Sequence, residues 1–214
     1  MDYREVIVSS GKKLLHEGFT VETWGNISVR DEDGLVYITP SGMDYETCTV
    51  DDVVVMTPDK KIVSGTRRPS IETDLHLLVY KARPEVRAIV HTHPINSTVF
   101  SCMGESIPIL TDEAAQALGD EIRTAAYGLP GSIELAENCV SALGRKANAC
   151  LLQSHGAVCV GADMKSAFKV AKVLEMTAEI YYRIRAVGGT YIPLTPENIA
   201  AMQDFVAHRY GQPK

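Results

Sequence analysis

Apolar residues recur at the period of an α-helix in six segments of the chain. Gly18 follows the first of these segments and Pro84 follows the second, and both residue types commonly end helices. Ser70 is the predicted N-cap of the second segment, because its hydroxyl suits a free backbone N–H. The six predicted helices span residues 1–18, 70–83, 95–102, 132–143, 164–187 and 196–210.

Shorter apolar runs between these segments have the length or alternation of β-strands. Two of them flank the dipeptide Asp33-Gly34, which suits a hairpin turn. The predicted strands span residues 27–30, 35–39, 53–57, 62–65, 86–92, 149–153 and 157–160. Four early strands in close succession predict an antiparallel sheet. With the helices, they favour a single α/β domain over residues 1–214, with a central, mostly antiparallel sheet covered by helices on both faces.

Composition excludes several classes of protein. The 214 residues carry 21 Lys and Arg against 27 Asp and Glu, and this net charge of −6 argues against a nucleic-acid partner. Mean hydropathy is −0.02, and the apolar run 147–160 is interrupted by Asn148, Gln153 and His155, so no segment is expected to cross a membrane. The five cysteines form no CxxC pair and residues 1–10 lack a signal-peptide pattern, which favours the reducing cytoplasm.

The tripeptide His91-Thr92-His93 stands at the end of an apolar predicted strand. Residues two apart on a strand point to the same side, so its two imidazoles converge. His155 lies in a turn between two other apolar strands, where Gly156 lets the backbone bend, and is the candidate third ligand. Three neutral imidazoles suit zinc or a similar ion and leave an open coordination position. The alternative is a pair of histidines that only pack in the core or at an edge.

Glu72 lies in the first turn of the second predicted helix and is a candidate acid or base. The helix dipole alone also explains a carboxylate there, and His76, one turn later, needs no more than local packing. Three turns, at residues 24–26, 39–42 and 69–71, offer hydroxyls and backbone N–H groups to an anion such as phosphate. Taken singly, each of them is an ordinary turn.

Together these segments resemble one family, the class II aldolases of the fuculose-1-phosphate type, which also contains ribulose-5-phosphate 4-epimerases and adducin head domains. The segments follow the family's order across nearly the whole chain. The matching residues are Trp24-Gly25-Asn26-Ile27-Ser28, Thr39-Pro40-Ser41-Gly42, Pro69-Ser70-Ile71-Glu72 with His76, Val90-His91-Thr92-His93-Pro94, Gly131-Ser132, Glu134-Leu135-Ala136-Glu137-Asn138 and Leu151-Leu152-Gln153-Ser154-His155-Gly156.

The resemblance implies a three-layer α/β/α fold and a metal-dependent aldolase. Its substrate would be a ketose 1-phosphate of the fuculose or deoxyribulose kind, cleaved to dihydroxyacetone phosphate and a short aldehyde. The implied divalent metal is zinc, with manganese or cobalt as alternatives, held by His91, His93 and His155, and Glu72 is the implied acid or base. The implied phosphate-binding residues are Gly25, Asn26, Ser41, Gly42, Ser70 and Ile71.

The family also implies a four-fold symmetric homotetramer with sites at subunit boundaries, where a neighbour's C-terminal tyrosine reaches in. Tyr210 matches that tyrosine. Two positions depart from the family pattern. Asp112, next to Glu113, stands where these aldolases have a tyrosine that gives a proton to the aldehyde-side oxygen. Its carboxylate takes over that role, selects a different aldehyde fragment, marks a relative that eliminates water or epimerises, or only begins a helix over 111–118. Ile71 replaces a serine of many relatives, so only its backbone N–H is left for the phosphate.

Two alternatives to the aldolase stay open. A sister enzyme, either a sugar-phosphate 4-epimerase or a methylthioribulose-1-phosphate dehydratase, would use a carboxylate at 112–113 as its working base. Glu72 favours the aldolase, because the epimerases carry aspartate there. A non-catalytic scaffold of the adducin-head kind would keep the fold without the metal, and the three histidines argue against it. In either enzyme the expected partner is a small phosphorylated sugar.

Overall fold

The computed structural model describes residues 2–212. Its helices are α1 (Tyr3–His16), α2 (Thr73–Ala82), α3 (Ile95–Met103), α4 (Asp112–Leu118), α5 (Ile133–Leu143), α6 (Met164–Ala186) and α7 (Pro196–His208), with a short 3₁₀ turn η1 (Val50–Asp52). Its strands are β1 (Asn26–Arg30), β2 (Val36–Ile38), β3 (Val54–Met56), β4 (Ile62–Ser64), β5 (Ala88–Thr92), β6 (Thr124–Ala125), β7 (Ala149–Leu152) and β8 (Gly156–Gly161).

The strands form one sheet in the order β4-β3-β2-β1-β5-β8-β7-β6. Every neighbouring pair is antiparallel except β6 and β7 at one edge. The prediction of a mostly antiparallel sheet is therefore confirmed. Strand β5 lies at the centre, with β1 on one side and β8 on the other, so segments far apart in the sequence meet there.

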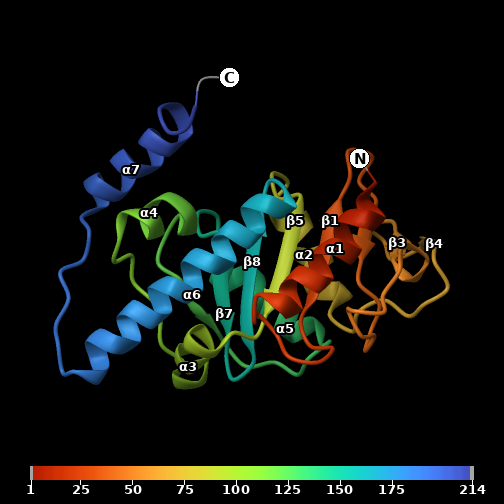
Figure 1. The fold of residues 1–214 in the computed structure, drawn as a ribbon, viewed down its shortest axis with the longest axis horizontal. Coiled ribbons are helices and arrows are strands. Elements are labelled where there is room, and N and C mark those ends of the chain that lie inside the picture. The colour runs from red at the N-terminus through yellow and green to blue at the C-terminus, as the bar shows by residue number, and fades with distance from the viewer. Residues whose placement is uncertain (1, 213–214) are drawn as a thin grey trace.

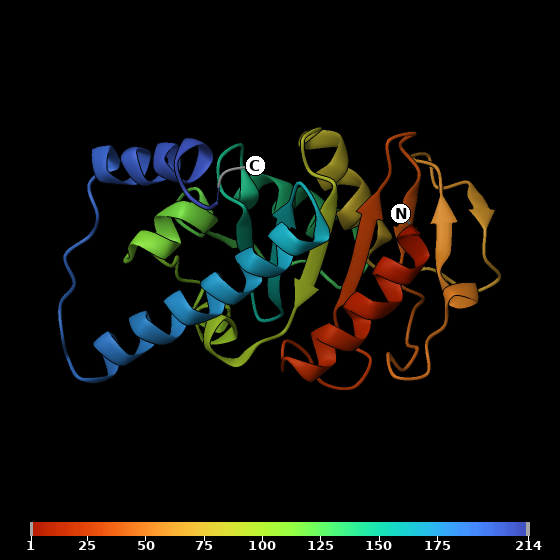
Figure 2. The ribbon, with the colours of Figure 1, turned by 45° about the horizontal axis from the view of Figure 1, so that its top comes forward.

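Helices cover both faces of this sheet, as predicted. Helices α1 and α6 lie across one face, with α3 and α4 beside α6, while α2 and α5 lie behind the strands (Figures 1 and 2). Alternate residues of each strand pack against the helices on opposite faces of the sheet, because successive side chains of a strand point to opposite faces. On β5, Val90 packs on the α6 side and Ile89 on the α2 side. His91 has the parity of Ile89 and therefore faces α2.

The start of α2 differs from the prediction that Ser70 caps it. The helix begins at Thr73 with Glu72 at the N-cap, and the Ser70 hydroxyl accepts a hydrogen bond from the Glu72 N–H at 3.2 Å. Ser70 lies outside the helix because its own N–H bonds the carbonyl of Thr39 and the neighbouring Pro69 pairs with Pro40 as an isolated bridge. Because Pro69 and Ser70 pair with Pro40 and Thr39, the helix begins three residues later than predicted.

The remaining helices agree with the predictions to within a few residues. The helix start proposed at 111–118 is real, since Thr111 caps α4 and its hydroxyl accepts from the N–H of Ala114. Strand β6 and the turn η1 were not predicted from the sequence. Within residues 2–212, no helix combines the length and the apolar character that a membrane span requires.

Candidate metal centre

Three imidazoles converge at the end of β5. The Nε2 atom of His91 lies 2.9 Å from Nε2 of His93 and 3.3 Å from Nε2 of His155. His91 is the last-but-one residue of β5 and His93 follows its end, so both rings leave the same side of the strand. His155 comes from the turn between β7 and β8. The predicted convergence is therefore confirmed, and it joins positions 64 residues apart.

The turn that presents His155 depends on close backbone packing. Ser154 has φ of +55°, a left-handed conformation that few residues with a side chain adopt. At Gly156, a Cβ atom would lie 2.3 Å from the carbonyl oxygen of Thr92 and 3.0 Å from Cδ2 of His93. Gly156 therefore lets β8 approach β5 closely enough for the histidines to meet.

The lowered pKa values of His93 and His155 suit metal binding, because they keep these two rings neutral. Burial, and then the charges of His91 and His155, lower the pKa of His93 to about 3. Burial and His91 lower the pKa of His155 to about 4. Burial acts in the same direction on His91, but the nearby carboxylate of Glu72 outweighs it and raises the pKa of that imidazole. Its Nδ1 lies 3.0 Å from the carbonyl oxygen of Ala157, which accepts only, so Nδ1 carries a proton and Nε2 is the ring nitrogen left for a metal.

Glu72 faces the three histidines from the start of α2. Its Oε2 lies 3.1 Å from Nε2 of His91, and its Oε1 lies 3.6 Å from Nε2 of His155. Burial would raise the pKa of this carboxyl, but His91, then His155 and a hydrogen bond from Asn26, hold the pKa well below its usual value. Its Oε1 is buried without a hydrogen-bond partner among the described residues. Glu72 is thus a carboxylate with one oxygen free for proton transfer.

The donor set fits a divalent cation. Imidazole nitrogens with lone pairs and a carboxylate face one another at the cluster, and such acceptors satisfy each other only through protons or a cation. Tetrahedral zinc with bonds of about 2.0–2.1 Å to nitrogen places its ligands about 3.3 Å apart. The separations of His91 Nε2 from the other two Nε2 atoms are 2.9 and 3.3 Å, and all the ligand atoms lie within 4.8 Å of one another. The cluster of His91, His93 and His155 is therefore consistent with a divalent metal site.

A cavity of about 570 Å³ opens above this cluster. The residues predicted to bind phosphate line it together with Glu72 and two of the histidines; they are Gly25, Asn26, Ser41, Gly42, Ser70 and Ile71. Hydrogen bonds from Ser41 N–H to the Arg68 carbonyl and from Ser70 N–H to the Thr39 carbonyl hold two of the turns together. The third turn is anchored at Gly25, where φ is +72° and a Cβ atom would lie 2.7 Å from the His91 carbonyl oxygen.

Two predicted site residues lie elsewhere in this chain. Asp112 is exposed at the first turn of α4, and Tyr210 is 67% exposed just after α7. Neither residue lines the cavity. Their participation stays a prediction, and for Tyr210 it requires a second copy of the chain. Conversely, sequence reasoning gave His76 no role beyond local packing, whereas the structure joins it to Asn26 beside the site.

Comparisons with known proteins agree with this geometry. The profile of the class II aldolase and adducin N-terminal domain matches residues 5–182. The chain is 37% identical over 186 residues to a 5-deoxy-D-ribulose 1-phosphate aldolase of Bacillus thuringiensis serovar kurstaki, a match that covers 86% of each chain. It is 38% identical over 181 residues to a 5-methylthioribulose-1-phosphate/5-deoxyribulose-1-phosphate aldolase of Rhodospirillum rubrum, covering 84% of this chain and 80% of that one.

Structural comparison supports the same family. The solved structure of an L-fuculose 1-phosphate aldolase matches with a TM-score of 0.90 and 34% identity, over 95% of both chains. The family profile, the sequence identities and the structural similarity therefore agree. The chain belongs to the class II aldolase and adducin N-terminal family.

Proposed function

We propose that this protein is a metal-dependent aldolase that reversibly cleaves a ketose 1-phosphate to dihydroxyacetone phosphate and a short aldehyde. One observation carries the proposal. A buried carboxylate, Glu72, faces three converging imidazoles at the floor of a cavity whose walls are turns suited to phosphate. The relatives named for 5-deoxyribulose 1-phosphate make that sugar the first substrate to test.

Breaking a carbon–carbon bond beside a carbonyl leaves electrons on carbon. His91, His93 and His155 would hold a divalent cation, which would supply a Lewis acid for this charge. In cleavage, the substrate hydroxyl that becomes the aldehyde gives up its proton, and Glu72 takes up one proton on its unpartnered Oε1 and passes it to that carbon. In the condensing direction Glu72 removes the proton from that carbon, and the aldehyde oxygen takes one up. General acid–base catalysis of this kind accelerates a step by about 10²–10⁴-fold.

The phosphate of the substrate would bind at the turns that line the cavity. Ser41 and Ser70 offer hydroxyls, and the N-terminus of α2 adds the positive end of its dipole. Ile71, 63% exposed at the cavity, contributes only a backbone N–H. Binding energy from this remote group orients the reacting end of the sugar.

Zinc is the proposed metal, because three uncharged nitrogen ligands and an open position are typical of catalytic zinc. We place the enzyme in the cytoplasm, where its five unpaired cysteines stay reduced. A homotetramer is supported by α7, none of whose residues is buried in the isolated chain. In that assembly Asp112 and Tyr210 would reach the cavity of a neighbouring copy.

The test is to incubate the zinc-loaded protein with 5-deoxyribulose 1-phosphate and, separately, with fuculose 1-phosphate. Dihydroxyacetone phosphate, detected by coupled reduction with a glycerol-phosphate dehydrogenase, is the expected product. The control is Glu72→Gln, which should keep its metal while turnover falls by about 10²–10⁴-fold. Formation of an epimer or of a dehydration product without dihydroxyacetone phosphate would overturn the proposal.

A further inference from the structure

A buried row of polar side chains joins α2 to β1 behind the metal site. Glu72, His76 and Tyr80 recur every fourth residue on one side of α2. Asn26 and Ser28 alternate along β1 on the face that α2 covers. Four helical residues rise about 6 Å and two strand residues rise about 6.7 Å, so the two rows stay in step.

Hydrogen bonds connect the two rows alternately. Asn26 Nδ2 lies 2.7 Å from Oε2 of Glu72, and Asn26 Oδ1 lies 2.5 Å from Nε2 of His76. Oγ of Ser28 lies 2.6 Å from Nδ1 of His76 and 2.7 Å from the hydroxyl of Tyr80. Each of these five residues is at most 6% exposed, so water does not compete for the bonds.

The direction of every bond in this row follows from its end at Glu72. A carboxylate only accepts, so the amide nitrogen of Asn26 faces Glu72 and its oxygen faces His76. That oxygen needs a donor, which places the proton of His76 on Nε2. A neutral imidazole then accepts at Nδ1 from the Ser28 hydroxyl, which in turn accepts from Tyr80. Hydrogen bonds that all run one way polarise each other and gain strength.

Burial keeps both titratable members of the row in the required form. It lowers the pKa of His76 to about 3, so the imidazole is neutral at physiological pH. It raises the pKa of the Tyr80 hydroxyl, which therefore keeps its proton and donates.

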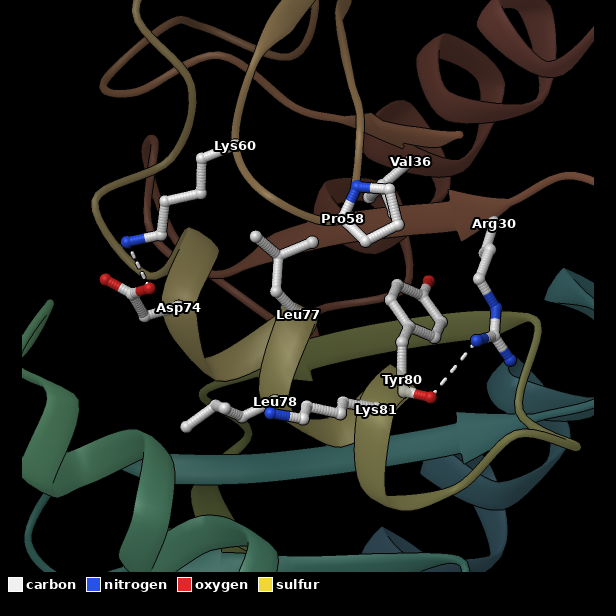
Figure 3. Close-up of a pocket in the computed structure, with 9 residues that line it drawn as sticks. All are labelled: Arg30, Val36, Pro58, Lys60, Asp74, Leu77, Leu78, Tyr80 and Lys81. Carbon is white, nitrogen blue, oxygen red and sulfur yellow. Dashed lines mark hydrogen bonds and ion pairs between the residues drawn. The ribbon is translucent and has the colours of Figure 1, made fainter. Parts of the chain in front are cut away.

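The outer end of the row is held by Arg30. Its Nη1 donates to the carbonyl oxygen of Tyr80 at 3.1 Å, and its guanidinium carbon lies 4.9 Å from the centre of the Tyr80 ring. Figure 3 shows the two side chains next to each other at the edge of a cavity. The row therefore begins at a fixed anchor and ends at the reacting carboxylate.

We propose that His76 is a positioning residue of the aldolase. Through Asn26 it holds Oε2 of Glu72 and leaves Oε1 as the oxygen that carries the proton. This inference rests on the proposed function, since it assigns that task to Glu72. His76 acts through another side chain and does not touch the substrate.

The first experiment is ¹⁵N NMR of the zinc-loaded protein, with the His76 signals assigned by their loss in His76→Gln. The expected result is a neutral ring with its proton on Nε2 throughout pH 6–8. A proton on Nδ1, or a charged ring in this range, would overturn the proposal. This measurement uses the wild-type chain and does not depend on any variant folding.

The second experiment separates positioning from folding by kinetics. His76→Leu removes the donor to Asn26 and should lower kcat by about 10²-fold, the effect of a small misplacement of a reacting group. Its KM and zinc content should not change. His76→Gln restores an N–H donor and should recover most of kcat. Thr177→Val is the control, because it removes a buried hydrogen bond in α6, far from the row, and should leave kcat unchanged.

The outcomes distinguish this inference from the proposed function. A His76→Leu enzyme with wild-type kcat overturns the positioning role while leaving the aldolase intact. A wild-type protein without aldolase activity overturns the proposed function, whereas the NMR result still reports on the bond directions. Equal losses of kcat in His76→Leu and His76→Gln also overturn the inference.

Discussion

Asn26 stands directly opposite His91 in the pairing of β1 with β5, and its side-chain amide reaches Oε2 of Glu72 at 2.7 Å. One strand thus carries metal-site histidines while its neighbour carries the amide that holds the carboxylate. A slip of one residue between β1 and β5 would turn Asn26 to the other face of the sheet. The register of two central strands therefore fixes the relation between the proposed base and the metal site.

Replacing one ligand should remove the metal and the activity together. We expect His93→Ala to lose more than about 100-fold in zinc affinity, because even partners of ligands cost 10- to 100-fold when mutated. Zinc content after dialysis and turnover of the same samples measure this effect. His16→Ala, at an exposed histidine outside the site, is the control. Zinc retained at full stoichiometry by His93→Ala would contradict the ligand assignment.

Stability should depend on pH through His76. Its pKa is lowered to about 3 by burial in the folded protein and lies near 6.5 in the unfolded chain. Below pH 6.5 the unfolded chain binds a proton that the folded chain does not. The stability of the wild type relative to His76→Gln should therefore fall with decreasing pH, by about 1.4 kcal/mol per unit between pH 6.5 and 3.

Urea unfolding of the metal-free proteins between pH 4.5 and 8 measures this difference. Above pH 7 the two stability curves should run parallel, which serves as the internal control. A constant difference across the whole range would mean that His76 is not held neutral by burial.

A methyl group at position 156 should disturb the site through the backbone. We expect Gly156→Ala to cost about 1–3 kcal/mol of stability, as overpacking does, because its Cβ meets the Thr92 carbonyl. It should also weaken zinc binding by separating β8 from His93. Gly104→Ala, at φ +67° with no atom within 4 Å of the new Cβ, should cost about 1–2 kcal/mol and leave zinc binding unchanged. Calorimetry and zinc titration compare the two variants, and equal zinc affinities would refute the packing argument.

Mixing two inactive variants tests whether neighbours share a site. If Glu72 and Tyr210 act together across a boundary, Glu72→Gln and Tyr210→Ala subunits should complement each other after mixed refolding. Random tetramers at equal amounts restore both residues in about a quarter of the sites. Activity of the mixture no higher than that of the separate variants would show that Tyr210 acts in its own chain or not at all.

Local sequence signals predicted much of the fold, because most elements carry their own pattern. Helix α6 shows helical periodicity over its full length, and the hairpin between β1 and β2 has its Asp33-Gly34 turn. Strand β6 was missed because it is two residues long and exists only by pairing with β7. The start of α2 was misplaced for a similar reason, since bonds to Thr39 hold Ser70 outside the helix.

The convergence of His91 and His93 was predictable, because residues two apart on a strand point to the same side. The role of His76 was not. Its partners Asn26 and Ser28 are spaced by two on β1, while His76 itself belongs to a row spaced by four on α2. Neither row indicates the other until β1 and α2 are known to pack together. The roles of Asp112 and Tyr210 stay predictions, because neither residue lines the cavity of its own chain.

The three histidines of the candidate metal site lie far apart in the sequence, so they come together only late in folding. His91 and His93 are synthesised well before His155, so the complete chelate exists only after β8 has closed against β5. A cation held by all three would therefore enter at a late stage of folding and would favour the native state over every earlier species. Without the metal, the native state would be less stable, and more of the enzyme would be open to proteolysis in the cell.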